Sequence, residues 1–161
     1  MIVIVMGVVG AGKTTVGRML ADELGWQFAD ADDFHSQSNV DKIRHGIALT
    51  DRDREPWLEH LRIALADWIE AGTSVVLACS ALKEKYRKIL DVGPEVRFVF
   101  LKGSASLIVQ RLQSRHGHFA NEQILASQIA DLEEPHTAIV EDISRTPPEI
   151  VADIRQKLNL A

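Results

Sequence analysis

The sequence contains a single cysteine, Cys79, which excludes an internal disulfide and fits a reducing compartment. An excess of basic residues is also missing, because 23 aspartates and glutamates outnumber 18 lysines and arginines and give a formal net charge of -5. This balance argues against a general nucleic-acid or membrane-surface binder, although it leaves room for a local basic pocket. We therefore expect a cytoplasmic protein that binds neither nucleic acid nor membrane.

Long hydrophobic runs are absent as well. The apolar run IVIVM at residues 2–6 is far too short to span a membrane, and its β-branched composition predicts a buried strand. A chain of 161 residues can bury one core without disulfides. Because no repeat, linker or low-complexity tract divides the chain, the sequence predicts a single domain over residues 1–161.

Segments of strand length alternate with helical patterns along the chain. Strands are expected at residues 2–6, 26–30, 74–80, 96–102 and 138–143. Helices are expected at residues 14–24, 55–71, 81–90, 104–115 and 121–132, and from the capping box TPPE (146–149) onward. In the helix at 55–71, Asp53 is expected as the N-cap, and Trp57 and Trp68 lie on the apolar stripe. This alternation predicts an α/β fold, with helices on both faces of a parallel sheet.

A glycine-rich loop follows the first predicted strand. GVVGAGKT (7–14) meets the P-loop pattern in full, with a strand before it and a helix after it. The glycines allow successive N–H groups to point at phosphate oxygens, and the helix N-terminus adds its positive dipole end. Lys13 is predicted to reach the β- and γ-phosphates, and Thr14 to offer its hydroxyl to Mg²⁺. The loop predicts an ATP or GTP site but not the group that receives the phosphate.

Acidic residues follow the second predicted strand, in DADDFH (30–35). Asp30 and Asp32 are two residues apart and are expected to point the same way from an extended strand end. Because ligands collect at the carboxyl ends of parallel strands, a carboxylate here would accept a hydroxyl proton or hold Mg²⁺ through water. A solvated, aspartate-rich turn is the alternative. His35 fits a polar pocket residue and a plain turn residue equally well.

Cations at helical spacing are candidates for binding anions. Arg54 lies near the start of the helix at 55–71, and Lys83 and Arg87 are four residues apart. The pattern alone favours ordinary surface ion pairs with Asp51, Asp53 or Glu84 for these cations. Arg111 and Arg115 are also four residues apart, beside the glycine-containing segment HGHFAN (116–121). They fit a lid that closes over a transferring phosphate, with a basic solvent-facing surface as the alternative.

Three other residues are assigned no chemistry. Cys79 ends an apolar strand, so packing is favoured over nucleophilic catalysis. His116 and His118 lack the partner spacing of a metal site, and no transition metal is assigned.

Seven segments, in order over nearly the whole chain, resemble the P-loop gluconokinases. They are GVVGAGKTT (7–15), DADDFH (30–35), NVDKIRHGIALTDRDREPWL (39–58), CSALKEKYR (79–87), FLKG (100–103), RHGHF (115–119) and LEEP (132–135). The resemblance implies transfer of the γ-phosphoryl group of ATP to the 6-hydroxyl of D-gluconate. It also implies a three-layer α/β/α fold like that of shikimate and adenylate kinases. In such a fold the parallel five-stranded sheet has the order 2-3-1-4-5, with a helical lid at about residues 112–134.

Residue roles follow from the resemblance at the matching positions. The phosphates would be held by Gly7, Val8, Val9, Gly10, Ala11, Gly12, Lys13, Thr14 and Thr15, and Mg²⁺ by Thr14 and, through water, by Asp30. Lys13, Asp32 and Arg115 are implied to be catalytic, with Asp32 positioning or deprotonating the acceptor hydroxyl. Asp32, His35, Arg54 and Lys83 would bind gluconate, Arg111 would contact the nucleotide, and Pro147 would wall the adenine. Related kinases are often dimers, so a homodimer is one expectation that the sequence does not decide.

Some positions depart from the family pattern. Ser36 stands where many members have proline, next to the substrate candidate His35. Val9 and Ala11 replace serines often found in the loop, a mild change because these positions act through their backbone. Two other hypotheses remain: a kinase for shikimate or a related sugar acid, and an ATP-binding module without acceptor chemistry.

Overall fold

The strands form one parallel sheet in a computed structural model that describes residues 1–114 and 119–161. The strands are β1 (Ile2–Met6), β2 (Gln27–Asp30), β3 (Val75–Ala78), β4 (Val96–Lys102) and β5 (Ile139–Asp142). Their spatial order is β2-β3-β1-β4-β5, and every neighbouring pair runs parallel. The α/β class and the sheet order expected from the sequence are both confirmed.

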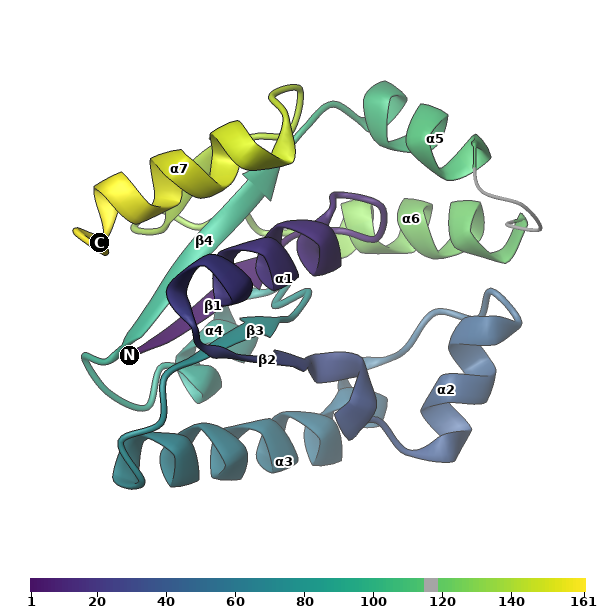
Figure 1. Ribbon diagram of the computed structural model, residues 1–161. Helices are drawn as coiled ribbons and strands as arrows, with labels where there is room; N and C mark the ends of the chain where they lie inside the picture. The colour runs from purple at the N-terminus through teal and green to yellow at the C-terminus, as the bar shows by residue number, and fades with distance from the viewer. Residues whose placement is uncertain (115–118) are drawn as a thin grey trace.

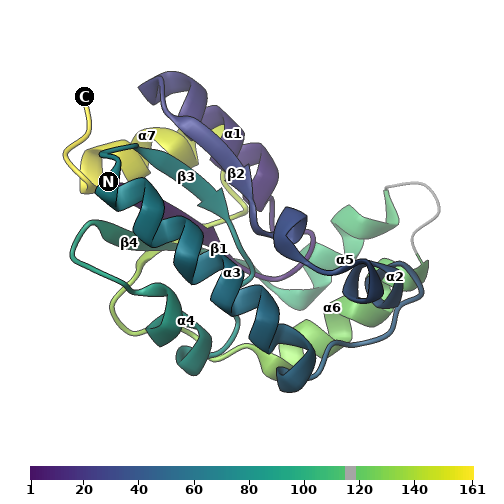
Figure 2. The ribbon, with the colours of Figure 1, turned by 90° about the horizontal axis from the view of Figure 1, so that it is seen from below.

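Helices cover both faces of the sheet (Figures 1 and 2). Helices α1 (Lys13–Leu24) and α7 (Pro147–Lys157) lie together on one face, and α3 (Asp51–Glu70) and α4 (Glu84–Leu90) lie on the other. Beyond the carboxyl ends of the strands lie α2 (Gln37–Arg44), α5 (Ala105–Gln113) and α6 (Phe119–Asp131). Loops and helix ends that carry polar groups therefore converge at that edge of the sheet.

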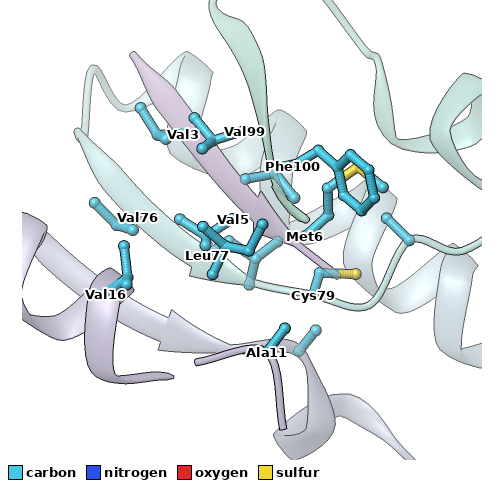
Figure 3. Packing of buried hydrophobic residues seen from close by; sticks show 14 of the residues in the cluster. Val3, Val5, Met6, Ala11, Val16, Val76, Leu77, Cys79, Val99 and Phe100 are labelled. Atoms are coloured by element: carbon cyan, nitrogen blue, oxygen red, sulfur yellow. The ribbon is translucent and has the colours of Figure 1, made fainter. Parts of the chain in front are cut away.

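The central strand explains why helices are needed on both faces. All five residues of β1 are fully inaccessible to solvent, and β1 pairs with β3 on one side and β4 on the other. Figure 3 shows the Cys79 side chain just beyond β3, among Met6 and Ala11 of the core. The expectation that Cys79 packs in the core is confirmed, since the residue is only 1% exposed.

Helix α3 begins earlier than its apolar stripe predicts. Thr50 is the N-cap, and its hydroxyl accepts a hydrogen bond from the Asp53 N–H, while the Asp53 side chain accepts from the Thr50 N–H. The prediction that Asp53 is the N-cap is therefore wrong: Asp53 is the third residue of a capping box. The extra turn brings Arg54 inside the helix, on the face that also buries Trp57.

Two short elements were not predicted from the sequence, and the helix predicted at 81–90 starts later than expected. The 3-10 helix η1 (Ala31–Phe34) and α2 carry too few apolar residues for a periodic signal. Helix α4 starts at Glu84 and not at 81, because Ala81 has a φ of 44°, which lies in the left-handed region. The capping box predicted at TPPE is confirmed at the start of α7.

No helix among the described residues is long and apolar enough to cross a membrane.

The Thr50 capping box is expected to contribute measurably to stability. Thr50→Ala should lower the free energy of unfolding by about 1 kcal/mol, because the Asp53 N–H at the start of α3 loses the hydroxyl that accepts its hydrogen bond. Urea denaturation followed by circular dichroism measures this change. Thr137→Ala, at an exposed loop position between α6 and β5, is the matched control and should have little effect. Equal effects of the two substitutions would contradict the role of the cap.

Candidate active site

The P-loop connects the buried strand β1 to helix α1. Gly10 and Gly12 have φ angles of 82° and 98°, which L side chains rarely adopt, so this loop shape requires glycine. Gly12 is the N-cap of α1, and none of the side chains that the structure describes caps the helix there. The first N–H groups of α1 are therefore available to an anion, and the helix dipole favours one.

Lys13 lies folded over this loop. Its Nζ donates to the carbonyl oxygens of Gly7 and Val8, at 3.0 Å each. This arrangement holds a positive charge at the mouth of the loop, where phosphate oxygens would arrive.

A cavity of about 270 Å³ opens at the carboxyl ends of the strands. It is lined by Val9, Gly10, Gly12, Lys13, Thr14, Thr15, Asp30, Asp32, His35, Ile43, Ala48, Leu49, Arg54, Trp57, Ala78, Cys79, Ser80, Ile124, Ser127 and Gln128. The phosphate loop thus shares one cavity with the predicted residues Asp30, Asp32, His35 and Arg54. Sequence analysis assigned no role to the contributions of α2, α6 and Ser80. Ile43 and Ser80 lie in segments that carry the family resemblance but were given no role there, and the α6 residues lie in none of these segments.

Asp30 and Asp32 face the P-loop lysine, but not through the geometry expected for them. Asp30 ends β2, whereas Asp32 lies in η1, so the two residues do not share an extended strand end. The Asp30 Oδ1 accepts the Asp32 N–H at 2.9 Å, which starts the 3-10 turn. Burial raises the pKa of both carboxyl groups, and the nearby Lys13 charge partly offsets this rise.

His35 is held against Trp57 at the cavity wall. The two rings stack with centroids 4.4 Å apart, and the Trp57 Nε1 donates to the Ala31 carbonyl at 2.7 Å. The Asn39 Nδ2 lies 3.4 Å from the His35 Nδ1, and since an amide nitrogen only donates, the histidine proton is assigned to Nε2. Burial, and then the positive charge of Arg54, lower the pKa of His35 to about 4.

Arg54 is a buried cation, with its side chain 7% exposed. Its Nη1 donates to the Tyr86 Oη at 2.8 Å and to the Asp131 Oδ2 at 3.1 Å. The Tyr86 hydroxyl in turn donates to Asp51. The surface ion pair that the pattern favoured for Arg54 is therefore wrong: the capping box places Arg54 one turn into α3, facing α4 and α6.

Asp51 forms ion pairs with lysines at the other end of this hydrogen-bond network. The Lys83 Nζ lies 3.0 Å from one Asp51 oxygen, so for Lys83 the expected ion pair is confirmed. Hydrogen bonds from Lys85, Tyr86 and Lys83 hold the pKa of Asp51 well below its usual range. Lys83 does not line the cavity, and its role as an acceptor ligand stays a prediction.

The two residues expected to contact the nucleotide, one on α5 and one on α7, do not line this cavity. The Arg111 guanidinium donates to the Ile143 carbonyl, and Pro147 is the first residue of α7. Neither residue lines the cavity, so both assignments stay predictions. Arg115, His116 and His118 lie outside the described residues.

Helix α6 contacts both the P-loop and Arg54. The Gln128 Oε1 accepts the Val9 N–H of the P-loop at 2.7 Å, and Asp131, three residues later, accepts from Arg54. The spacing of three would have placed both residues on one face of the predicted helix at 121–132, but nothing in the sequence indicated that this face is turned toward the P-loop.

The lowered pKa of His35 predicts a pH dependence of stability. Because the folded pKa of about 4 lies below the ordinary value of 6.5, the unfolded chain binds more protons between these values. The free energy of unfolding should therefore fall as the pH drops from about 7 to about 5. His35→Phe keeps a ring on Trp57 without titrating and should flatten this fall. Urea titrations at several pH values measure it, and identical pH profiles for the two proteins would contradict the burial effect.

Comparison with known proteins places the chain among kinases. It matches the Shikimate kinase family over residues 9–159. It is 48% identical over 141 residues to the gluconokinase of Arabidopsis thaliana, covering 79% of this chain and 75% of that protein.

Two solved structures are similar over almost their full length. The crystal structure of a sugar kinase from Janibacter sp. HTCC2649 has a TM-score of 0.93 at 42% identity, covering 99% of this chain and 95% of that one. A gluconokinase from Sinorhizobium meliloti 1021 has a TM-score of 0.85 at 36% identity, covering 98% and 94%.

Proposed function

The chain belongs to the shikimate kinase family of P-loop kinases, with gluconokinases as close relatives, and from this premise we propose that it phosphorylates D-gluconate at the 6-hydroxyl with ATP. The products are 6-phospho-D-gluconate and ADP. The observation that carries the proposal is the shared cavity, in which Lys13 of the phosphate loop lies together with Asp32, His35 and Arg54.

The phosphate loop fits a nucleotide. The first N–H groups of α1 and the Lys13 ammonium offer positive charge to phosphate oxygens. Residues 7–15 would hold the phosphates. Arg111 and Pro147 remain the proposed contacts to the rest of the nucleotide, on the family resemblance alone.

The same region offers oxygen ligands for a hard cation. The Thr14 hydroxyl is the proposed direct ligand of Mg²⁺, and the Asp30 carboxylate is the proposed holder of its water. When bound, Mg²⁺ neutralises charge on the phosphate oxygens during transfer.

The acceptor half of the cavity fits a polyhydroxy acid. The Arg54 guanidinium is a buried, fixed cation and would pair with the gluconate carboxylate. The His35 imidazole is neutral near pH 7, so it would bond acceptor hydroxyl groups without adding charge. Lys83, bound to Asp51, would reach the acceptor only by leaving that carboxylate.

Asp32 is the proposed partner of the reacting hydroxyl group. Its raised pKa makes the carboxylate a better proton acceptor than an aspartate with the ordinary pKa, and the Lys13 charge partly offsets this rise. Phosphoryl transfer through a loose transition state asks mainly for positioning, so orienting the hydroxyl is the first task of Asp32. Arg115, in the proposed lid at about residues 112–134, would stabilise charge on the transferring group.

Measuring ADP release with ATP and Mg²⁺ tests the function. We expect release that depends on D-gluconate and exceeds that with shikimate, with other aldonic acids or without acceptor, and Lys13→Ala should serve as the inactive control. Preference for another acid would keep the kinase mechanism and reassign the acceptor. ATP binding without release under any acceptor would reject the enzyme in favour of a binding module.

Replacing Asp32 separates its roles as base and as binder. Asp32→Asn should lower kcat at least about 100-fold while ATP still binds, because the hydroxyl loses its proton acceptor. Asp33→Asn is the matched control, since this neighbour is exposed like Asp32 but does not line the cavity. A change in the gluconate KM alone, with kcat preserved, would make Asp32 a binding residue and not a base.

A further inference from the structure

The Arg54 guanidinium, which would bind the acceptor carboxylate, is already paired with a carboxylate of the protein itself. The Asp131 Oδ2 accepts from its Nη1 at 3.1 Å. We propose that Asp131 is a placeholder anion, which occupies Arg54 until the carboxylate of the acceptor replaces it and which thereby sets the acceptor affinity. The inference rests on the proposed function, because it concerns the acceptor half of the same cavity.

A buried guanidinium needs a counter-charge when no acceptor is present. Arg54 is 6% exposed, and an unpaired charge at such a position is strongly destabilising. Its other partner, Tyr86, is neutral, with a pKa raised to about 12 by burial and by its bond to Asp51. Over residues 1–114 and 119–161, Asp131 is the carboxylate that bonds Arg54 directly.

The position of Asp131 makes it a weakly held anion. It is the last residue of α6, where the negative end of the helix dipole opposes a carboxylate. Two further acids, Glu133 and Glu134, follow closely in the chain. The Asp131 side chain is also 27% exposed, so water can solvate it when it leaves Arg54.

Helix α6 does not depend on this ion pair to stay docked. Two residues further on, the Glu133 N–H donates to the Leu82 carbonyl at 2.8 Å, and the Glu133 side chain accepts the Glu84 N–H at 2.8 Å. The Arg87 Nη2 donates to the Glu133 carbonyl at 2.7 Å. These bonds anchor the end of α6 to α4 and to the segment before it, so Asp131 can release Arg54 without freeing the chain.

Two carboxylates on one guanidinium compete or repel each other. An acceptor carboxylate at Arg54 must either take over Nη1 or bind beside the charge of Asp131. In both cases Asp131 weakens binding of an anionic acceptor and leaves a neutral one largely unaffected. A purely structural role would have the opposite sign, because losing Asp131 would then disorder Arg54 and weaken acceptor binding.

Calorimetric titration of the full-length protein with D-gluconate tests this sign. Asp131→Asn should bind D-gluconate about 10-fold more tightly than the wild type, within the usual range for coupled sites. Binding of D-glucitol, which has the same carbon chain without the carboxylate, should not change, nor should the KM for ATP. Asp131→Glu, which keeps the charge, should bind D-gluconate like the wild type.

Glu134→Gln is the matched control. It removes a negative charge only three residues after Asp131, from a side chain that forms an exposed ion pair with Lys102. It should leave the gluconate affinity unchanged. Without ligand, Asp131→Asn should also melt at a lower temperature than the wild type, and D-gluconate should raise its melting temperature more than it raises that of the wild type. If Asp131→Asn does not fold, Asp131→Ser leaves room for water at Arg54 and takes its place.

Unchanged or weaker gluconate binding by the Asp131 variant overturns the placeholder, even if the wild type phosphorylates gluconate. Tighter carboxylate binding by the variant supports the placeholder, even if the wild type proves to use another acid as its acceptor. Absence of gluconate binding by both proteins overturns it as well. The two proposals can therefore fail separately.

Discussion

The complete burial of β1 is the constraint on which the rest of the structure depends. A strand whose five side chains are all inaccessible must have sheet neighbours on both edges and helices on both faces. Because neighbouring strands run parallel, each connection must return the chain to the other end of the sheet before the next strand begins. The chain leaves β1 through a tight loop. The P-loop, the acids after β2 and the residues after β3 meet at one edge because their strands are parallel.

A second constraint is the compensation of the buried Arg54 charge. It ties together three helices that are distant in sequence, since Arg54 is on α3, Tyr86 on α4 and Asp131 on α6. Asp51 extends this chain of bonds to two lysines near the surface. The proposed acceptor half of the cavity is thereby built around a fixed cation, while the proposed nucleotide half is built around backbone N–H groups. This division suits a reaction in which one substrate brings phosphates and the other a carboxylate.

Much of the site was predictable because its chemistry is local. Gly7, Gly12 and Lys13 act through a loop shape that the spacing itself encodes, and the structure has that loop. Asp32 and His35 could be placed near it because they follow β2, which is separated from β1 in the sheet only by β3. Arg54 became the favoured candidate for an anion ligand only through the family resemblance, because the local pattern indicated a surface ion pair.

The sequence by itself determined the α/β class, the positions of the strands and the phosphate loop, because hydrophobic periodicity and glycine spacing act over a few residues. Only the tertiary structure decided which side chains share the cavity. Gln128 meets Val9 and Asp131 meets Arg54 across separations of 119 and 77 residues, and no local pattern carries that information. The capping box at Thr50 likewise set which residues of α3 face inward. The partners of a buried charge depend on which helices pack around it, and that packing is a property of the folded chain.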